Sequence, residues 1–188
     1  IEINSGQNYI IKNNIFSNKG GGFASYFNTD VTASDLDYNN YYSSRRRISF
    51  YQNAIVDTFN NFRSLTGKDQ HSYSVNPFFT NDSNLVCNNA ILNNSALQIG
   101  IIASDINSNA RNNNPDIGAS EFDLCSNDAG IQDFIGISNP LAIGSNQIRV
   151  VIQNHGTNNL TSAIVHWSVN GIMQPDYTWN GNLGYKEN

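Results

Sequence analysis

The sequence predicts an all-β protein, and three features of its 188 residues lead to this class. The β-branched residues Ile, Val and Thr total 37, whereas Leu and Met together total 10. Glu and Lys, which commonly fill helix surfaces, number only 3 and 4. Asn occurs 33 times, and Asn favours turns because it tolerates left-handed backbone angles and bonds to its own backbone. These counts favour short strands joined by many turns.

A repeated pattern indicates that the N-terminal strands stack on one another. Residues 13–16 read Asn-Asn-Ile-Phe, and residues 39–42 read Asn-Asn-Tyr-Tyr. These two copies start 26 residues apart, and a weaker third copy, Asn-Asn-Ala-Ile at residues 88–91, lies close to two such intervals further on. Intervals of this length are typical of solenoids, in which each coil lies about 4.8 Å from the next. We therefore expect Asn14 and Asn40 to stack at equivalent turns, in a ladder of amide hydrogen bonds.

One segment of the sequence predicts a short helix. Phe59, Phe62 and Leu65 recur three residues apart and define one narrow apolar face. Asp57 is expected to cap the start of this helix, and Gly67 is expected to end it. Because so short a helix is unstable alone, we expect it to pack against the strands.

The order of features between residues 34 and 122 resembles a known group of proteins. The motifs that carry the resemblance are residues 34–42, the helix that ends in residues 65–69, and residues 74–79, 94–100 and 115–122. In this combination they are similar to the C-terminal coils of bacterial secreted, right-handed parallel β-helix repeat proteins. The last of them, preceded by Arg111, resembles the segment that closes such a β-helix. The resemblance implies a parallel β-helix over residues 1–122.

Simple physical arguments agree with a closing role for the last of these motifs. The end of a solenoid has an unpaired coil that must be covered. Pro115 suits such an edge because it cannot donate a hydrogen bond to a ladder. Arg111 is expected to form a local ion pair there with Asp116 or Glu121.

The composition changes after a linker at residues 123–130, and a second domain is predicted over residues 131–188. Asn170 and Gly171 give the strongest two-residue hairpin signal. This domain resembles an immunoglobulin-like β-sandwich of the kind found in adhesion proteins, with Trp167 as its core aromatic residue. The strands that we predict are residues 131–138, 147–153, 163–169 and 172–179.

The predicted sandwich is incomplete, because a full one has about seven strands. Residues 180–184 are expected to form a turn that leads into a further strand. The 188 residues are therefore expected to be an interior piece of a much longer surface protein.

Several function classes find no support in the sequence. The net charge of −5 argues against a nucleic-acid-binding protein, which needs a basic face. No apolar run approaches the roughly 20 residues of a transmembrane segment. The sequence contains no Gly-X-Ser-X-Gly motif, and His71, His155 and His166 lack the spacing of metal ligands. Asp35 and Asp37 share a strand face, but without a third group we predict no catalytic residue in this stretch.

A polar loop offers the only hint of a metal ion. Asp105, Asn107 and Asn109 alternate like the start of a calcium-binding loop. The sixth and twelfth positions, however, hold Ala110 and Asp116 where an EF-hand needs Gly and Glu. An Asx-rich turn is therefore the favoured interpretation and calcium is the alternative; no other cofactor is expected.

Three adjacent arginines, residues 45–47, precede a predicted strand. Guanidinium groups bind the carboxylate and phosphate groups of anionic glycans and similar ligands well. The alternative is a solvated edge at the start of the strand, which needs no ligand.

Cys87 and Cys125 are the two cysteines of the chain. An even number in an exported protein permits a disulfide, which here would tie the closing segment to the coils. The alternative is a buried thiol at Cys87 and an exposed thiol at Cys125.

The resemblance also implies where the protein acts and with what. Proteins of this group are secreted or lie on the bacterial cell surface, and many are exported by type IX secretion. Our first hypothesis is a non-catalytic fragment that serves adhesion or carbohydrate interaction, with a polysaccharide or cell-surface glycan and the secretion machinery as partners. The alternative is the C-terminal part of a β-helix polysaccharide lyase or glycoside hydrolase whose active site lies upstream. Whether the whole protein is an enzyme stays open.

Overall fold

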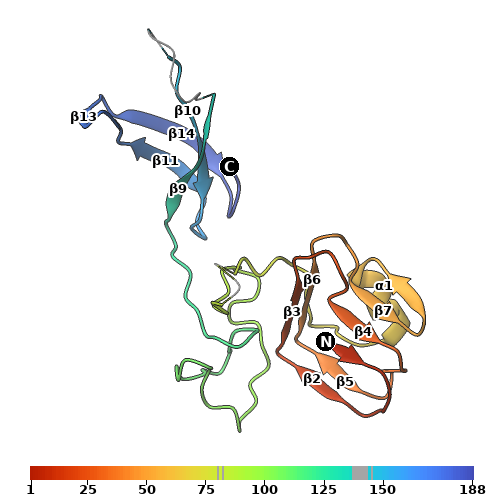
Figure 1. Ribbon diagram of the computed structural model, residues 1–188. Coiled ribbons are helices and arrows are strands. Elements are labelled where there is room, and N and C mark those ends of the chain that lie inside the picture. The colour runs from red at the N-terminus through yellow and green to blue at the C-terminus, as the bar shows by residue number, and fades with distance from the viewer. Residues whose placement is uncertain (80, 82, 137–143, 145) are drawn as a thin grey trace. The chain divides into compact units, whose positions relative to one another are not determined.

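The computed structural model describes residues 1–79, 81, 83–136, 144 and 146–188 (Figure 1). The chain divides into two compact units, Ile1–Asp123 and Leu124–Asn188. Strands dominate the regular structure of both units, and the described residues contain a single helix of 8 residues. The predicted dominance of strands is therefore confirmed. No described helix has the length and the apolar character needed to span a bilayer.

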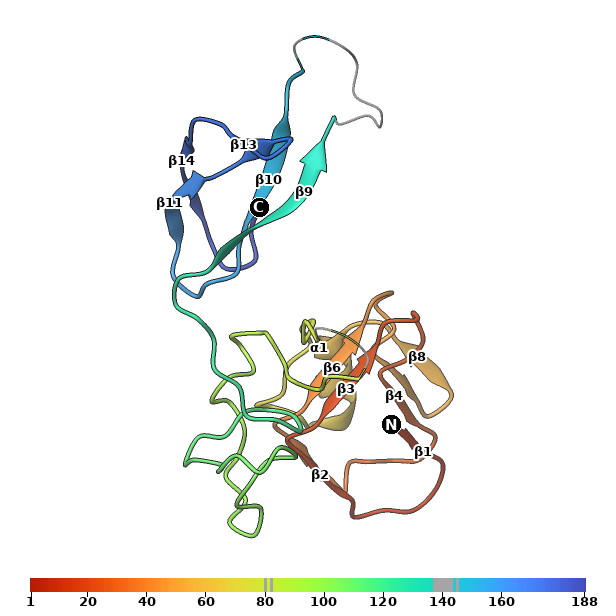
Figure 2. The same ribbon diagram turned by 60° about the vertical axis from the view of Figure 1, so that its left-hand side comes forward.

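The first unit begins with short strands that pair in a regular order. Each strand pairs in parallel with the strand three places later, which gives the sets β1–β4–β7, β2–β5 and β3–β6. The chain therefore passes through three sheets in each turn, and the two views in Figures 1 and 2 both show the paired strands side by side. The strands are β1 (Glu2–Ile3), β2 (Ile10–Lys12), β3 (Ile15–Asn18), β4 (Ser25–Phe27), β5 (Asp35–Asp37), β6 (Asn40–Ser43) and β7 (Ser49–Tyr51).

The register of these turns differs from the spacing of the sequence motif. Ile15 lies opposite Asn40 in the third sheet, one position earlier than the motif spacing requires. Glu2 lies opposite Tyr26 in the first sheet, two positions earlier than that spacing requires. The expected stacking of Asn14 on Asn40 is therefore wrong by one position. The reason is that the hydrogen bonds between strands and the turns that connect them set the number of residues between paired positions. The recurring residue types do not set this number.

The asparagine ladder exists in this shifted form. The Oδ1 atom of Asn39 accepts a hydrogen bond from the Asn14 backbone N–H at 3.0 Å and from the Asn14 side chain at 3.2 Å. The Asn40 N–H donates to the Asn14 carbonyl at 2.8 Å, so the residue just before β3 still bonds to the start of β6. The third copy of the motif, residues 88–91, lies outside the strands.

A hairpin and a helix follow the parallel strands. β8 (Ala54–Val56) pairs antiparallel with β7, so the parallel order of that sheet ends at β7. Gln52 and Asn53 in the hairpin turn have φ values of 46° and 64°, as a type I′ turn requires. Helix α1 (Phe59–Thr66) comes next.

The ends of α1 agree with the prediction at one end only. Gly67 ends the helix with a left-handed φ of 67°, as predicted. The N-cap is Thr58 rather than Asp57, because the Thr58 side chain accepts the Asn61 backbone N–H at 3.3 Å.

The buried face of α1 also differs from the expected one. Phe59 and Phe62 are buried, but Leu65 is 55% exposed, and Thr66 is buried in its place. At about 100° per residue, a residue six positions after Phe59 lies about 120° away from it around the helix, whereas the seventh lies within about 20°. The three-residue spacing that singled out Leu65 was therefore the wrong period.

Aromatic rings form the centre of the first unit. Phe62 of α1 is fully buried, and its ring lies 5.9 Å from that of Phe27 and 5.5 Å from that of Tyr41. The helix thus joins rings from two different sheets. The buried core consists of Ile11, Ala24, Phe27, Val31, Leu36, Tyr41, Ile48, Tyr51, Val56, Phe59 and Phe62.

Residues 74–123 form no named strand or helix where they are described, yet they bond to the strands. The Asn13 side chain accepts the Leu97 N–H at 3.0 Å and donates to the Leu97 carbonyl at 2.7 Å. The Gly118 N–H donates to the Asn13 carbonyl at 3.0 Å. Arg111 Nη1 lies 2.7 Å from Glu121 Oε1, which confirms the expected ion pair. The predicted closing segment therefore lies against β3.

The second unit contains antiparallel pairs. β9 pairs with β10, β11 with β14, and β12 with β13. Asn170 and Gly171 have positive φ values of 50° and 81° between β12 and β13, so the predicted hairpin is confirmed. The strands are β9 (Ala129–Ile135), β10 (Arg149–Asn154), β11 (Leu160–Val165), β12 (Ser168–Val169), β13 (Ile172–Met173) and β14 (Tyr177–Leu183).

Three expectations for the second unit need correction. β11 ends at Val165, so Trp167 lies between strands, is 37% exposed and donates its indole N–H to the Pro175 carbonyl at 2.8 Å. It is not a core residue. β14 continues to Leu183, so residues 180–184 are mostly strand rather than a turn. β9 starts at Ala129, before the end of the expected linker, and the last residues of the predicted strand 131–138 lie outside the described part of the chain.

Candidate binding surface

The two carboxylates that share strand β5 belong to separate pairs. Lys12 Nζ lies 2.6 Å from Asp35 Oδ2. His71 Nδ1 lies 2.7 Å from Asp37 Oδ2, and the His71 backbone N–H donates to Asp37 Oδ1 at 2.8 Å. Each carboxylate is thus engaged by its own partner.

The contact between Asp37 and His71 holds the loop that contains His71 against the outside of β5. Burial by itself would raise the pKa of Asp37, but hydrogen bonds from the His71 ring, the His71 N–H and the Tyr38 N–H bring the pKa below its ordinary value. The Tyr38 ring also stacks on His71, with centroids 4.9 Å apart and an interplanar angle of 11°. This contact was not predictable from the sequence because the two segments are far apart in the chain.

The other two histidines lie in the second unit. His166 Nδ1 is 2.7 Å from Asp176 Oδ1, and His155 Nδ1 is 3.4 Å from Lys186 Nζ. Within the described residues, no group of three or more His, Cys, Asp or Glu side chains is arranged to hold a metal ion.

The polar loop at Asp105 folds as an Asx turn. Asp105 Oδ1 accepts the N–H groups of Asn107 and Asn109, both at 2.8 Å. Its Oδ2 accepts the Glu121 N–H at 2.8 Å and the Asn109 side chain at 3.0 Å. Both oxygens therefore bind N–H donors of the protein, and this arrangement supports the Asx-turn interpretation over calcium.

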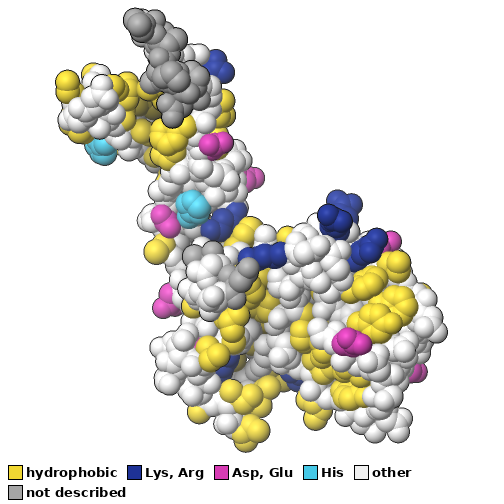
Figure 3. Space-filling model, in the orientation of Figure 1, with side chains coloured by type: hydrophobic (Ala, Val, Ile, Leu, Met, Phe, Trp, Pro, Cys, Tyr) yellow, Lys and Arg dark blue, Asp and Glu magenta, His cyan; other side chains and the backbone are white. Residues whose placement is uncertain are grey.

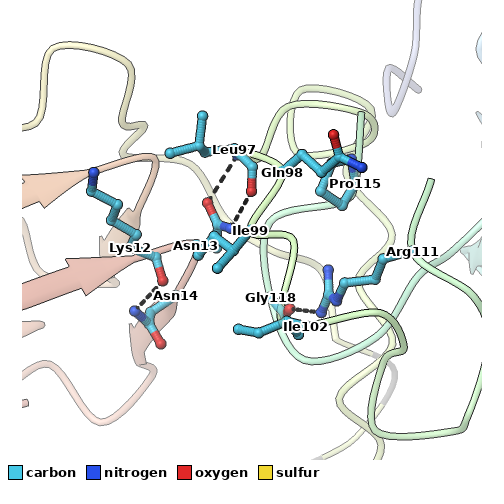
Figure 4. A pocket seen from close by; sticks show the side chains of 10 residues that line it. All are labelled: Lys12, Asn13, Asn14, Leu97, Gln98, Ile99, Ile102, Arg111, Pro115 and Gly118. Atoms are coloured by element: carbon cyan, nitrogen blue, oxygen red, sulfur yellow. Dashed lines mark hydrogen bonds between the residues drawn. The ribbon is translucent and has the colours of Figure 1, made fainter. Parts of the chain in front are cut away.

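A cavity of about 180 Å³ lies between the first turn of strands and the closing segment (Figure 4). It is smaller than typical ligand pockets of about 300–1,000 Å³. The side chains in Figure 4 come from β2 and the β2–β3 connection on one side and from the loop after residue 96 on the other. Its lining residues are Lys12, Asn13, Asn14, Leu97, Gln98, Ile99, Ile102, Arg111, Pro115 and Gly118.

The polar groups of this cavity are mostly engaged by the protein itself. Lys12 pairs with Asp35, and Asn13 with the Leu97 backbone. Arg111 pairs with Glu121 and donates to the Gly118 carbonyl at 2.7 Å, while its buried Nε has no partner among the described residues. A bound water commonly satisfies such a donor. The cavity therefore resembles a gap between two packed segments of the protein rather than a ligand-binding pocket.

Both cysteines are free thiols in the structure. Cys87 is buried and Cys125 is exposed, so the disulfide considered from the sequence is not formed there. The Cys87 Sγ donates to the Pro77 carbonyl at 3.0 Å, and burial raises the pKa of this thiol to about 12.

We expect the two thiols to differ strongly in reactivity. Thiolate is the reactive form, so at pH 7.5 Cys125 should react with iodoacetamide readily, and Cys87 only after denaturation. Mass spectrometry of peptides from native and denatured protein measures this difference. Two thiols that both stay unmodified in denatured protein until a reductant is added would instead indicate the disulfide.

The outer face of the β1–β4–β7–β8 sheet carries a row of large side chains. Tyr26 lies opposite Phe50 in the register of β4 and β7, and their rings stack with centroids 4.6 Å apart at 9°. Phe23 continues the row, 5.7 Å from Phe50. Ile55 of β8 lies opposite Phe50 and is 55% exposed. Figure 3 shows hydrophobic side chains gathered over β4 and β7, with Lys and Arg side chains above them.

These residues face outward because neighbours in a strand alternate between the two faces. Ser25 and Phe27 are buried on either side of Tyr26, and Ser49 and Tyr51 are buried on either side of Phe50. Tyr26 and Phe50 are only half-buried. We name Phe23, Tyr26, Phe50 and Ile55 the outer row.

The three arginines lie beside one end of the outer row. The Ala24 N–H donates to the Arg47 carbonyl at 3.3 Å, which places residue 47 next to the segment that holds Phe23. Arg45, Arg46 and Arg47 are all exposed. No ion pair joins any of them to an acidic side chain within the described part of the chain.

The three arginines stand out in the sequence, whereas the outer row does not. In the register of the structure Tyr26 falls opposite Phe50, whereas the spacing of the asparagine motif would have placed Gln52 there. The pattern that could have revealed the row is therefore visible only once the register is known. Comparisons of this chain with protein-family models, with curated proteins and with solved structures found no match.

Proposed function

We propose that this chain is a non-catalytic, glycan-binding part of a large bacterial protein that is secreted or held on the cell surface. In this proposal the first unit is the terminal part of a right-handed parallel β-helix, and the second is an immunoglobulin-like sandwich that serves as a spacer. Adhesion through polysaccharide and export by the type IX route are parts of the same proposal.

The parallel order of strands supports the proposed architecture. Pairing of each strand with the one three places later gives three short parallel sheets, as a β-helix has. Parallel connections between strands of one sheet are almost always right-handed. The antiparallel pairs β9–β10 and β11–β14 are compatible with two facing sheets of a sandwich.

The observation that carries the proposed function is the outer row. Aromatic rings on a surface offer flat apolar faces, on which the C–H faces of sugar rings can stack. Successive strands lie about 4.8 Å apart, and the Tyr26 and Phe50 rings stack face to face across them, so the half-buried pair presents its remaining apolar ring surface as one unit. The row continues through Phe23 and Ile55, which lengthens it into a track for a chain rather than a pocket for one sugar.

Binding to immobilised polysaccharides, both neutral and acidic, tests this proposal. Replacing the Phe50 ring should cost about 1.5–3 kcal/mol of binding free energy, by analogy with full burial of such a side chain. This corresponds to a roughly 10- to 100-fold weaker Kd for Phe50→Ala. Tyr26→Ala should act in the same direction. Product analysis of the same incubations, for unsaturated or newly reducing sugars, tests the lyase or hydrolase alternative.

A matched control is Tyr177→Ala, because Tyr177 is a 61% exposed aromatic residue on a strand of the second unit. It should bind as the parent protein does. Phe50→Leu keeps most of the apolar volume and removes only the flat ring, so it separates stacking from folding. If the parent protein binds none of the polysaccharides, or if Phe50→Ala and Phe50→Leu both bind normally, the proposal is wrong.

A further inference from the structure

We propose that residues 45–47 make the outer row selective for acidic polysaccharides, those that carry carboxylate or sulfate groups. This inference rests on the proposed glycan-binding function and names its ligand class. It is carried by the position of the three arginines beside the aromatic rings and by the absence of an acidic partner for them within the described residues.

The loop that holds the arginines is anchored on the same loop of the preceding turn. The Ser43 hydroxyl donates to the Gly22 carbonyl at 2.7 Å, and the Ser44 N–H donates to the Asn18 carbonyl at 3.1 Å. The Arg45 stem crosses directly over Gly21, where a β-carbon would lie only 2.4 Å from Arg45 Cδ. With φ at 85°, position 21 also favours glycine. The arginines are therefore held on a defined loop at the end of the row.

The charge near the row is arranged unevenly, and this favours a sparsely charged polymer. At the β1 side, Glu2 lies opposite Tyr26 and is exposed, so a carboxylate lies beside one flank of the row. Arg47 lies beside the segment that precedes β4, three residues before Phe50 in the chain. A polymer with a charge on some sugars can place its anionic groups at the arginines and its apolar faces on Tyr26 and Phe50.

A single-stranded nucleic acid is the competing ligand class, since it also combines bases that stack with an anionic backbone. Its charge is carried on every nucleotide, so it would meet Glu2 as well as the arginines. The whole chain also has a net charge of −5, which opposes a densely charged polyanion. The observations therefore favour the glycan.

Binding of a partly methyl-esterified polyuronate, of its fully methyl-esterified form and of a single-stranded oligonucleotide tests the inference. The ester keeps the sugar rings and removes the charge. The parent protein should bind the polyuronate about 10-fold or more tightly than the ester, and the preference should fall as salt is raised. The triple variant R45Q/R46Q/R47Q should lose this preference while its binding of the ester is unchanged.

Arg149→Gln is the matched control, because Arg149 is an exposed arginine of the second unit. It should keep the full preference for polyuronate. Equal binding of the two polymers by the parent protein overturns the inference and leaves the proposed function intact. Tighter binding of the oligonucleotide than of the polyuronate overturns it in favour of nucleic acid. Binding of neither polymer overturns the inference, and the proposed function fails with it only if the parent protein also binds none of the other polysaccharides.

Discussion

Asp69→Ala should destabilise the first unit by about 3–5 kcal/mol, the range for breaking a buried charged network. Asp69 is fully buried, and its carboxylate is the shared acceptor of three side chains. Its Oδ1 accepts from the Ser72 hydroxyl at 2.6 Å and from the Asn39 amide at 3.1 Å. Its Oδ2 accepts from the Tyr41 hydroxyl at 3.2 Å. Alanine would remove this acceptor from all three buried donors, of which the Asn39 amide keeps only the Ile11 carbonyl.

The backbone of Asp69 is held as firmly as its side chain. The Asp69 N–H donates to the Leu36 carbonyl at 2.9 Å, and Arg63 of α1 donates to the Asp69 carbonyl at 2.8 Å. Arg63 also donates to the Ser72 carbonyl. The residue thus joins β5, the end of α1 and the loop that follows, which is why its loss should affect the whole unit.

Asp69→Asn separates the hydrogen bonds from the charge. Burial raises the pKa of Asp69 above its ordinary value, so the folded state holds the proton more tightly than the unfolded state does. The stability contributed by this proton is complete below the unfolded pKa and is lost as pH rises through the folded pKa. The free energy of unfolding of Asp69→Asn, relative to that of the parent protein, should therefore increase as pH rises through that range.

Urea unfolding of the parent protein and both variants between pH 3.5 and 7.5 measures these effects. The amide keeps one oxygen for Ser72 and Asn39, so Asp69→Asn should be clearly more stable than Asp69→Ala at pH 7. If the difference in the free energy of unfolding between Asp69→Asn and the parent protein does not change with pH, the raised pKa of Asp69 is contradicted. An Asp69→Ala variant as stable as the parent protein would contradict the network itself.

Asn39→Ala should cost about 3 kcal/mol, because several buried groups lose their partner at once. The Asn39 side chain is fully buried and joins two neighbouring turns of strands. Its oxygen accepts the Asn14 N–H at 3.0 Å, and its amide donates to the Ile11 carbonyl at 2.8 Å and to Asp69.

Asn14→Ala is the matched control for this prediction. Asn14 is the partner of Asn39 in the same contact, but its side chain is exposed and its backbone N–H survives the substitution. Its cost should stay below about 1 kcal/mol, as for most surface substitutions. Thermal unfolding followed by circular dichroism compares the two. Similar costs for both variants would show that the ladder does not depend on the buried asparagine.

Sequence patterns predicted those features of the fold that depend on local chemistry. The stop of α1 at Gly67 and the hairpin at Asn170 and Gly171 follow from backbone angles that these residues tolerate best. The ion pair of Arg111 with Glu121 was also predictable, because the two residues lie close in the chain.

Features that depend on register or on distant contacts were predicted less well. Two Asn-Asn pairs occur in successive turns, but the ladder joins the second Asn of one pair to the first of the next. Residue types alone carry no sign of that shift. Trp167 continues an alternating pattern, yet the strand ends before it at Val165, so alternation misplaced it in a core. The outer row could not be predicted from the sequence either. Tyr26 and Phe50 become neighbours only through the register of β4 and β7.

The most direct test of the central claim, that the outer row binds a glycan, is a nuclear magnetic resonance titration with an acidic oligosaccharide. We expect saturable shifts of the ring signals of Phe23, Tyr26 and Phe50. The indole signals of Trp167 and Trp179 in the second unit serve as internal references and should stay in place. Shifts confined to the indole signals, or no shift of the three rings at saturating ligand, would contradict the account.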